Sequence, residues 1–265
     1  MNQQNKNNKK AIVVLTRGYK DIANYDDLIK RNNSIVNVNS TTTDFIIFHE
    51  GNINEAHQQY ISGKSIHVNN IKFIDISEHA FNNDKNMIFF YPPTNSFSLS
   101  YRHMCSFWFV DFWKYVEEYD FIIRIDEDCI IQFSVDNLFT ILNNEQINCI
   151  FGKWSKEREF VTHKLNWFTR KFISTVFKNK VEKIPPHNPS GPYTNVIGFN
   201  LKKLRQNKIL QKYINAIKYS NAIYIYRWGD LPLWGEALYY FCDKNSYLKY
   251  NKIHYFHGSH NILVN

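Results

Sequence analysis

The chain has 265 residues, of which 44% are hydrophobic and 17% aromatic, so it can bury a large core and is not a disordered protein. Its formal net charge is +8, yet no long basic run stands out beyond NKNNKK at residues 5–10. Without a clustered basic patch, a nucleic-acid partner is not expected. The charge fits a groove for an anionic, phosphorylated ligand or a generally basic surface.

The cysteines and the N-terminus exclude several classes of protein. No two cysteines form a CxxC pair, so we predict buried free thiols and neither a zinc site nor a disulfide framework. The first ten residues lack the apolar core of a signal peptide, and no apolar run reaches the roughly 18 residues that a membrane span needs. We therefore expect a soluble, cytoplasmic protein without a membrane span. Abundant Asn, Lys, Ile, Tyr and Phe indicate an AT-rich source genome, viral or protist.

Short apolar runs alternate with helical patterns over the first half of the chain. Strands are predicted at residues 11–18, 44–51 and 71–77, and the helix-spaced segment YDDLIKRNNSIVN lies between the first two. An aromatic-rich helical pattern follows at residues 98–119, with Ser98 or Ser100 as its cap. The near-continuous apolar run FIIRI, residues 121–125, is typical of a central strand covered on both faces.

The second half continues the alternation. Residues 153–183 are basic and aromatic and predict a helix and loop over the sheet, before the Pro-rich loop IPPHNPSGPYTN. The segment VIGFNLKKL predicts a strand, WGDLPLWGEALYYFC a loop feeding a helix, and KIHYFHGSH a last strand. This order predicts an α/β fold with a Rossmann-like, mostly parallel central sheet flanked by helices. We expect a flexible tail over residues 1–10 and a single domain over residues 11–265.

Three consecutive carboxylates, Asp126, Glu127 and Asp128, interrupt an apolar stretch that otherwise predicts buried strands. Ligands of open α/β sheets bind beyond the carboxyl ends of the strands, which is where this triplet falls. Two carboxylates separated by one residue can reach one divalent cation, and oxygen ligands suit Mg²⁺ or Mn²⁺. Such a cation would bridge the phosphates of a nucleotide. Acidic triplets also cap helices or occupy solvated turns, but a solvated turn needs no buried strand on each side.

Four segments in one order resemble a known family. They are YRHMCSF at residues 101–107, YDFIIRIDED at 119–128, YIYRWGDLP at 224–232 and KIHYF at 252–256. Together they resemble the fungal-type α-1,2-mannosyltransferases of glycosyltransferase family 15, over about residues 11–260. The resemblance implies a GT-A fold, a GDP-mannose donor, Mn²⁺ and retention of anomeric configuration.

The resemblance also implies which residues hold the metal and the donor. Asp128 matches a family Asp and Asp126 stands where the family has Glu, which implies metal contact by Asp128, with Asp126 on the metal or the ribose. Glu127, in place of a family Pro, is expected at the cofactor. A late histidine often completes the metal shell of GT-A enzymes, which implies His257 or His260.

Further donor contacts are expected from residues at the family positions and at the end of the first strand. Arg102 is expected to pair with the diphosphate and to stabilise the leaving group, and is thus a catalytic as well as a binding candidate. The remaining candidates for cofactor binding are Thr16, Arg17, Gly18 and Tyr101. Asp230 is the best remaining carboxylate, either as a base beside the acceptor or as the N-cap of the following helix.

Ile197 stands in place of a candidate catalytic Glu of the family, so a protein nucleophile cannot operate there. If the reaction inverts, Asp230 would be the base; if it retains, a front-face attack assisted by the leaving phosphate needs no protein nucleophile.

We expect transfer of a hexose such as mannose from a GDP- or UDP-sugar to a hydroxyl of a glycan or glycoprotein. The alternatives are a metal-dependent nucleotidyltransferase or phosphohydrolase, and an inactive module that binds nucleotide sugars.

Overall fold

A seven-stranded sheet forms the centre of the computed structural model, which describes residues 8–36, 38, 42–81, 89–144, 146–258 and 260–262. The strand order is β10-β6-β9-β4-β1-β2-β3, and β9 runs antiparallel to both of its neighbours. The strands are β1 (Lys10–Leu15), β2 (Thr43–His49), β3 (Ile71–Asp75), β4 (Phe121–Ile125), β6 (Cys149–Phe151), β9 (Val196–Asn200) and β10 (Tyr247–Lys249). The expected mostly parallel sheet flanked by helices is confirmed.

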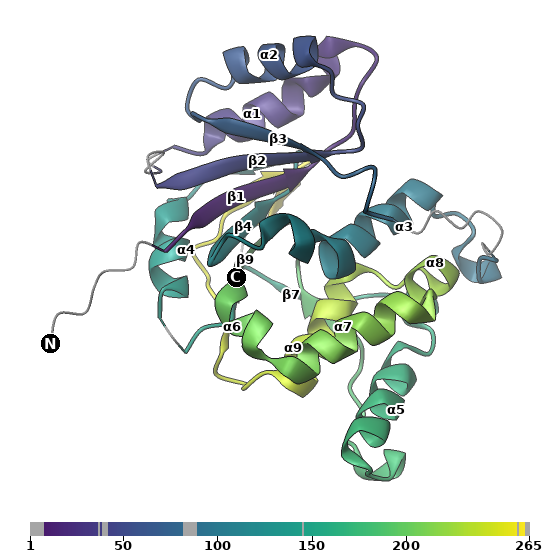
Figure 1. Cartoon of the computed structure of the whole chain (residues 1–265). Coiled ribbons are helices and arrows are strands. Elements are labelled where there is room, and N and C mark those ends of the chain that lie inside the picture. Colours follow the sequence, from purple (N-terminus) through teal and green to yellow (C-terminus); the bar gives the residue numbers. More distant parts are fainter. Residues whose placement is uncertain are drawn as a thin grey trace, which may run out of the picture.

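Helices cover both faces of this sheet (Figure 1). α1 (Asp26–Ser34) and α2 (Glu55–Lys64) pack on one face of the first strands, where Leu28 and Ile61 meet Val14 and Ile47. α4 (Val135–Leu142) extends this face beside β4. The opposite face carries α6 (Leu201–Gln206), α7 (Lys208–Ser220), α8 (Ala222–Tyr226) and α9 (Asp230–Phe241).

The aromatic segment expected to be one helix is divided in three. α3 (Leu99–Ser106) begins at the N-cap Ser98, whose hydroxyl accepts a hydrogen bond from the Tyr101 amide, 3.2 Å away. A π-helical turn (Phe107–Asp111) and a 3₁₀ turn (Phe112–Val116) then follow. The extra residue of a π turn rotates the helix face, and here Phe107, Trp108 and Phe109 are all buried.

Smaller elements complete the structure. β5 (Cys129–Ile131), β11 (Tyr255–His257) and β12 (His260–Ile262) form a three-stranded antiparallel sheet, and β7 (Trp154–Lys156) pairs with β8 (Ser190–Pro192). α5 (Leu165–Phe177) follows β7. In VIGFNLKKL, only Val196–Asn200 is a strand, because Asn200 caps α6 by accepting from the Lys203 amide.

The structure also describes the cysteines, the start of the chain and the lengths of the helices. All four cysteines are free, as predicted. β1 begins at Lys10 and the Lys9 amide donates to Asp120 at 3.0 Å, within the stretch expected as a tail; residues 1–7 of that stretch lie outside the described residues. In the part of the chain that the structure describes, no helix is long and apolar enough to cross a membrane.

Two glycines allow α9 to pack directly on β8. A Cβ on Gly235 would lie 1.7 Å from the Ser190 carbonyl oxygen, and one on Gly191 would lie 2.0 Å from the Leu231 carbonyl oxygen. These neighbours are backbone atoms, so they cannot move aside by changing rotamer. The close approach fixes the position of α9, whose first residue is Asp230.

Gly235→Ala should therefore lower the free energy of unfolding by about 1–3 kcal/mol, the usual cost of overpacking a buried site. Gly63→Ala is the matched control: it is also helical, its added Cβ meets nothing within 4 Å, and it should stabilise by about 0.5–1 kcal/mol. Urea denaturation measures both. Equal effects of the two substitutions would contradict the backbone contact.

Candidate functional site

The candidate site lies where β1 and β4 end. The segment 126–128 joins β4 to β5, and β11 pairs with β5 so that His257 is opposite Cys129. The Gly258 amide donates to the Asp128 carbonyl at 3.0 Å, and Gly258 has a φ of +56°. This turn brings the C-terminal segment against the carboxylate triplet, about 130 residues away in the chain.

Asp128 and His257 form the candidate metal pair. The His257 Nε2 lies 3.3 Å from Asp128 Oδ2, and the two side chains are 20% and 40% exposed, respectively. Cys129 Sγ lies in the same group, with all three ligand atoms within 4.8 Å of one another. Burial raises the pKa of the Cys129 thiol, which disfavours the thiolate that would bind a metal. A carboxylate oxygen and an imidazole nitrogen are a donor set that suits Mn²⁺.

Asp126 lies outside this group, and its side chain contacts Arg124 and Asn195, so its role on the metal or the ribose stays a prediction. Its Oδ1 accepts from Arg124 Nε at 2.8 Å, and its Oδ2 accepts from Arg124 Nη2 at 3.2 Å and from Asn195 Nδ2 at 3.0 Å. The Asp126 amide also donates to the Asn195 carbonyl at 2.8 Å. Asn195 Nδ2 in turn lies 3.0 Å from His257 Nε2, so Asp126 is connected to the metal pair through Asn195.

Arg124 is the centre of a buried charge network. It is 3% exposed, its guanidinium lies 4.4 Å from the centroid of the Trp108 ring, and it donates to both Asp126 and Asp230. Burial lowers the pKa of Arg124, but the two carboxylates outweigh that effect and raise it overall. The side chain is therefore a permanent cation held between two anions.

Asp230 is the first residue of α9 and not its N-cap, because Gly229 occupies the cap position. Its side chain is 7% exposed and pairs with Arg124. The cap role weighed from the sequence is therefore wrong by one residue. The carboxylate still lies at the positive end of the helix dipole.

Glu127 connects the triplet to the end of β1. It accepts hydrogen bonds from the Thr16 hydroxyl and, at 2.7 Å, from the Tyr19 hydroxyl. Burial raises the pKa of Glu127. The guanidinium of the exposed Arg17 lies 5.1 Å from the Tyr19 ring centroid.

Gly18 extends this edge of the site. Its amide donates to Asn52 Oδ1 at 2.7 Å, and a Cβ there would lie 2.1 Å from the Asn52 carbonyl oxygen. Of the candidates predicted at the end of the first strand, Thr16 contacts Glu127 directly, whereas Arg17 contacts Tyr19 and Gly18 contacts Asn52.

The position of Arg102 in the structure contradicts its expected role at the diphosphate. It is fully buried, and its guanidinium donates to the carbonyls of Thr94, Phe97 and Tyr224 while lying 3.9 Å from the Phe90 ring centroid. Those bonds join α3 to the segments before it and to α8. Arg102 is a structural residue here, because its guanidinium donates its hydrogen bonds to backbone carbonyls.

Tyr101 is likewise occupied within the protein. Its hydroxyl accepts a hydrogen bond from Arg227 Nη2, and the Arg227 guanidinium lies over the rings of Phe97 and Tyr101, 4.3 and 4.5 Å from their centroids. Burial raises the pKa of Tyr101. This arrangement gives no direct support for a donor contact.

Ile197 and His260 are the remaining positions singled out in the sequence. Ile197 is fully buried in β9 and belongs to the core, so it presents no group to the site. The backbone of His260, the first residue of β12, pairs with His257 of β11, and the side chain of His260 lies outside the described part of the structure.

The sequence did not predict the roles of Tyr19 and Asn195, nor the pairing of Arg124 with Asp230. Arg124 carried a readable signal, since a single cation in an apolar strand requires a buried counter-ion. The amide of Asn195 and the hydroxyl of Tyr19 carried none, because only the tertiary structure brings them to the triplet.

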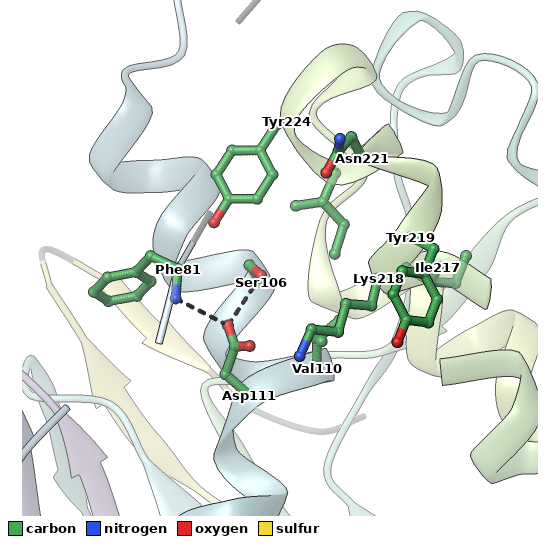
Figure 2. A pocket seen from close by; sticks show the side chains of 10 residues that line it. Phe81, Ser106, Val110, Asp111, Ile217, Lys218, Tyr219, Asn221 and Tyr224 are labelled. Atoms are coloured by element: carbon green, nitrogen blue, oxygen red, sulfur yellow. Dashed lines mark hydrogen bonds between the residues drawn. The ribbon is translucent and has the colours of Figure 1, made fainter. Parts of the chain in front are cut away.

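A hollow of about 300 Å³ lies elsewhere, between the π-helical turn and the end of α7 (Figure 2). Asp111 and Lys218 line it, and Asp111 accepts from the Ser106 hydroxyl at 3.1 Å. Burial raises the pKa of Asp111. None of the strand-end residues lines this hollow, so it is separate from the candidate site.

No protein-family model matches the chain. It is similar to solved mannosyltransferase structures: Core-mannan synthase A (CmsA/Ktr4) from Aspergillus fumigatus in its Mn/GDP form has a TM-score of 0.76 at 16% identity, covering 94% of this chain and 74% of that one. Mannosyltransferase Ktr4p from S. cerevisiae in complex with GDP has a TM-score of 0.75 at 16% identity, covering 96% and 72%. The chain has the GT-A glycosyltransferase fold.

A sequence relative of this GT-A chain agrees. The probable mannosyltransferase KTR3 of Saccharomyces cerevisiae is 29% identical over 177 residues, which are 61% of this chain and 41% of the relative. The chain thus spans less than half the length of the curated relatives that it matches. The resemblance to fungal mannosyltransferases inferred from the four sequence segments is confirmed.

The network around Arg124 predicts a large stability effect. Arg124→Leu should lower the free energy of unfolding by about 3–5 kcal/mol, because it leaves the buried Asp230 and the half-buried Asp126 without their counter-ion. The exposed Arg158 provides the control, and Arg158→Leu should change stability by less than about 0.5 kcal/mol. Denaturant titration with circular dichroism checks both, and similar values for the two variants would contradict the network.

Proposed function

We propose that the chain is a metal-dependent glycosyltransferase that moves mannose from GDP-mannose to a hydroxyl of a glycan or glycoprotein. The observation that carries the proposal is the pairing of Asp128 with His257 beyond the end of β4. In open α/β sheets this is where ligands bind. The fold and the relatives, all named as mannosyltransferases, support the same assignment.

The metal and the donor are inferred from the donor set and from the solved relatives. Asp128 and His257 would hold Mn²⁺, which when bound neutralises the diphosphate leaving group. The titles of two solved structures name Mn and GDP as bound in those proteins. In this chain the edge formed by Thr16, Gly18 and Glu127 would receive the base and ribose, as the end of the first strand does in other open α/β folds.

The carboxylates favour a route without a protein nucleophile. Among the described carboxylates of the site, Asp126 and Asp230 both pair with Arg124, and Glu127 accepts from Thr16 and Tyr19. Ile197 is buried in the core. We therefore infer a front-face attack in which the leaving phosphate takes the acceptor proton, with retention of configuration, and Asp230 as a positioning residue.

The function is tested by incubating the chain with Mn²⁺ and GDP-mannose and measuring released GDP together with a mannosylated acceptor. Asp128→Ala should abolish Mn²⁺-dependent release, and Asp27→Ala, at an exposed carboxylate on α1, should leave it unchanged. Release of pyrophosphate or inorganic phosphate would indicate a nucleotidyltransferase or phosphohydrolase instead. Binding without turnover would indicate an inactive nucleotide-sugar-binding module.

Asp230→Asn separates a base from a positioning residue. A general base contributes roughly 10²–10⁴-fold in rate, whereas the Asn side chain still accepts a hydrogen bond from Arg124. We expect turnover to fall by less than about 10²-fold, with the anomeric configuration of the product unchanged by nuclear magnetic resonance. A larger loss with an unchanged KM for the donor, together with an inverted product from the unmodified chain, would identify Asp230 as the base.

A further inference from the structure

Helix α5 extends away from the body of the molecule (Figure 1). One side of it packs inward, with Leu165, Thr169 and Ile173 buried at helical spacing. The opposite side exposes Lys164, Trp167, Lys171, Thr175 and Lys178, which we call the α5 stripe. The spacing of three and four residues places these side chains on one face of the helix, with Lys164 and Lys178 at its two caps.

The stripe presents an aromatic residue that the protein leaves in solvent. Trp167 is 59% exposed, and Phe177 at the end of the helix is 49% exposed. The other five tryptophans of the chain are buried or half-buried. A tryptophan side chain favours a position where its apolar ring is covered and its N–H is hydrated, as at a membrane–water interface.

The charge around Trp167 is mostly positive. Residues 164–183 contain five lysines and one arginine against one acidic residue, Glu182, which lies in the 3₁₀ turn (Val181–Lys183) that contacts α5. The arginine, Arg170, donates to the Val181 carbonyl at 2.7 Å, so the outward charge comes from lysines. A lysine is a point charge on a flexible stem, whereas bidentate phosphate recognition favours arginine. A lysine surface therefore suits a fluid layer of anionic head groups better than a fixed phosphate pattern.

We propose that the α5 stripe is a docking surface for an anionic lipid membrane. Trp167 would insert at the head-group level, and Lys164, Lys171 and Lys178 would lie over the anionic lipids. The chain would bind the surface peripherally, since the apolar side of α5 remains packed against the protein.

Docking through α5 would also orient the candidate site. The Trp228 indole donates to the His163 carbonyl at 2.8 Å, directly before α5. Asn166 donates to the fully buried Glu236 of α9, at 3.1 Å from its Oε2. Because α9 begins at Asp230, the membrane surface would be held at a fixed orientation to the strand-end site. The proposal does not depend on which sugar is transferred.

The test is sedimentation of the full chain with vesicles of phosphatidylcholine alone or with phosphatidylserine. We expect binding to the anionic vesicles only, and a loss of roughly fivefold in partition coefficient for each lysine neutralised. Lys171→Gln with Lys178→Gln should therefore lower binding about 25-fold. The control pair Lys202→Gln with Lys208→Gln, at exposed sites on α6 and α7, has the same net charge and should bind nearly as the unmodified chain does.

Fluorescence gives a second reading that does not depend on charge. Brominated lipids should quench the tryptophan emission of the unmodified chain, and Trp167→Phe should remove that quenching. The proposal is overturned if the chain does not bind anionic vesicles, if both lysine pairs weaken binding equally, or if the quenching survives in Trp167→Phe. Binding to a polyanion such as heparin through the stripe, without vesicle binding, would also overturn it.

Discussion

The site depends on a single buried cation. Arg124 lies within the fully buried strand β4, and side chains alternate along a strand, so it faces the aromatic layer that contains Trp108. A charge in that position is tolerable only with counter-ions, which Asp126 and Asp230 supply from the end of the strand and the start of α9. The resulting network ties the sheet to α9 and fixes the direction in which Asp126 points.

The fixed direction of Asp126 explains how three adjacent carboxylates coexist. Asp126 pairs with Arg124, Glu127 accepts from Thr16 and Tyr19, and Asp128 faces His257. Each carboxylate thus has its own partners, and these four residues come from different parts of the chain. Of the three, Asp128 is left at the solvent-facing edge beside an imidazole, where a divalent cation would complete its surroundings.

Local sequence patterns were enough to predict five strands of the central sheet, a helix cap at Ser98 or Ser100 and the position of the triplet, because strand periodicity and capping are short-range effects. The short strands β6 and β10 were not predicted, since three residues are too few to show a period. Local patterns could not predict which residue each of the three carboxylates contacts. The direction of Arg102 into the core was also unreadable, since a helix position and a motif do not say which face is buried. The cap role weighed for Asp230 belongs to Gly229, which has no side chain to signal the position.

The central claim is that Asp128 and His257 hold a divalent cation at the end of β4. Anomalous diffraction at the manganese absorption edge, from crystals soaked with MnCl₂ and GDP, tests it most directly. The account predicts one strong anomalous peak within coordination distance of both the Asp128 carboxylate and His257 Nε2. A peak bound elsewhere, or no peak at this pair in crystals that hold ordered GDP, would contradict it.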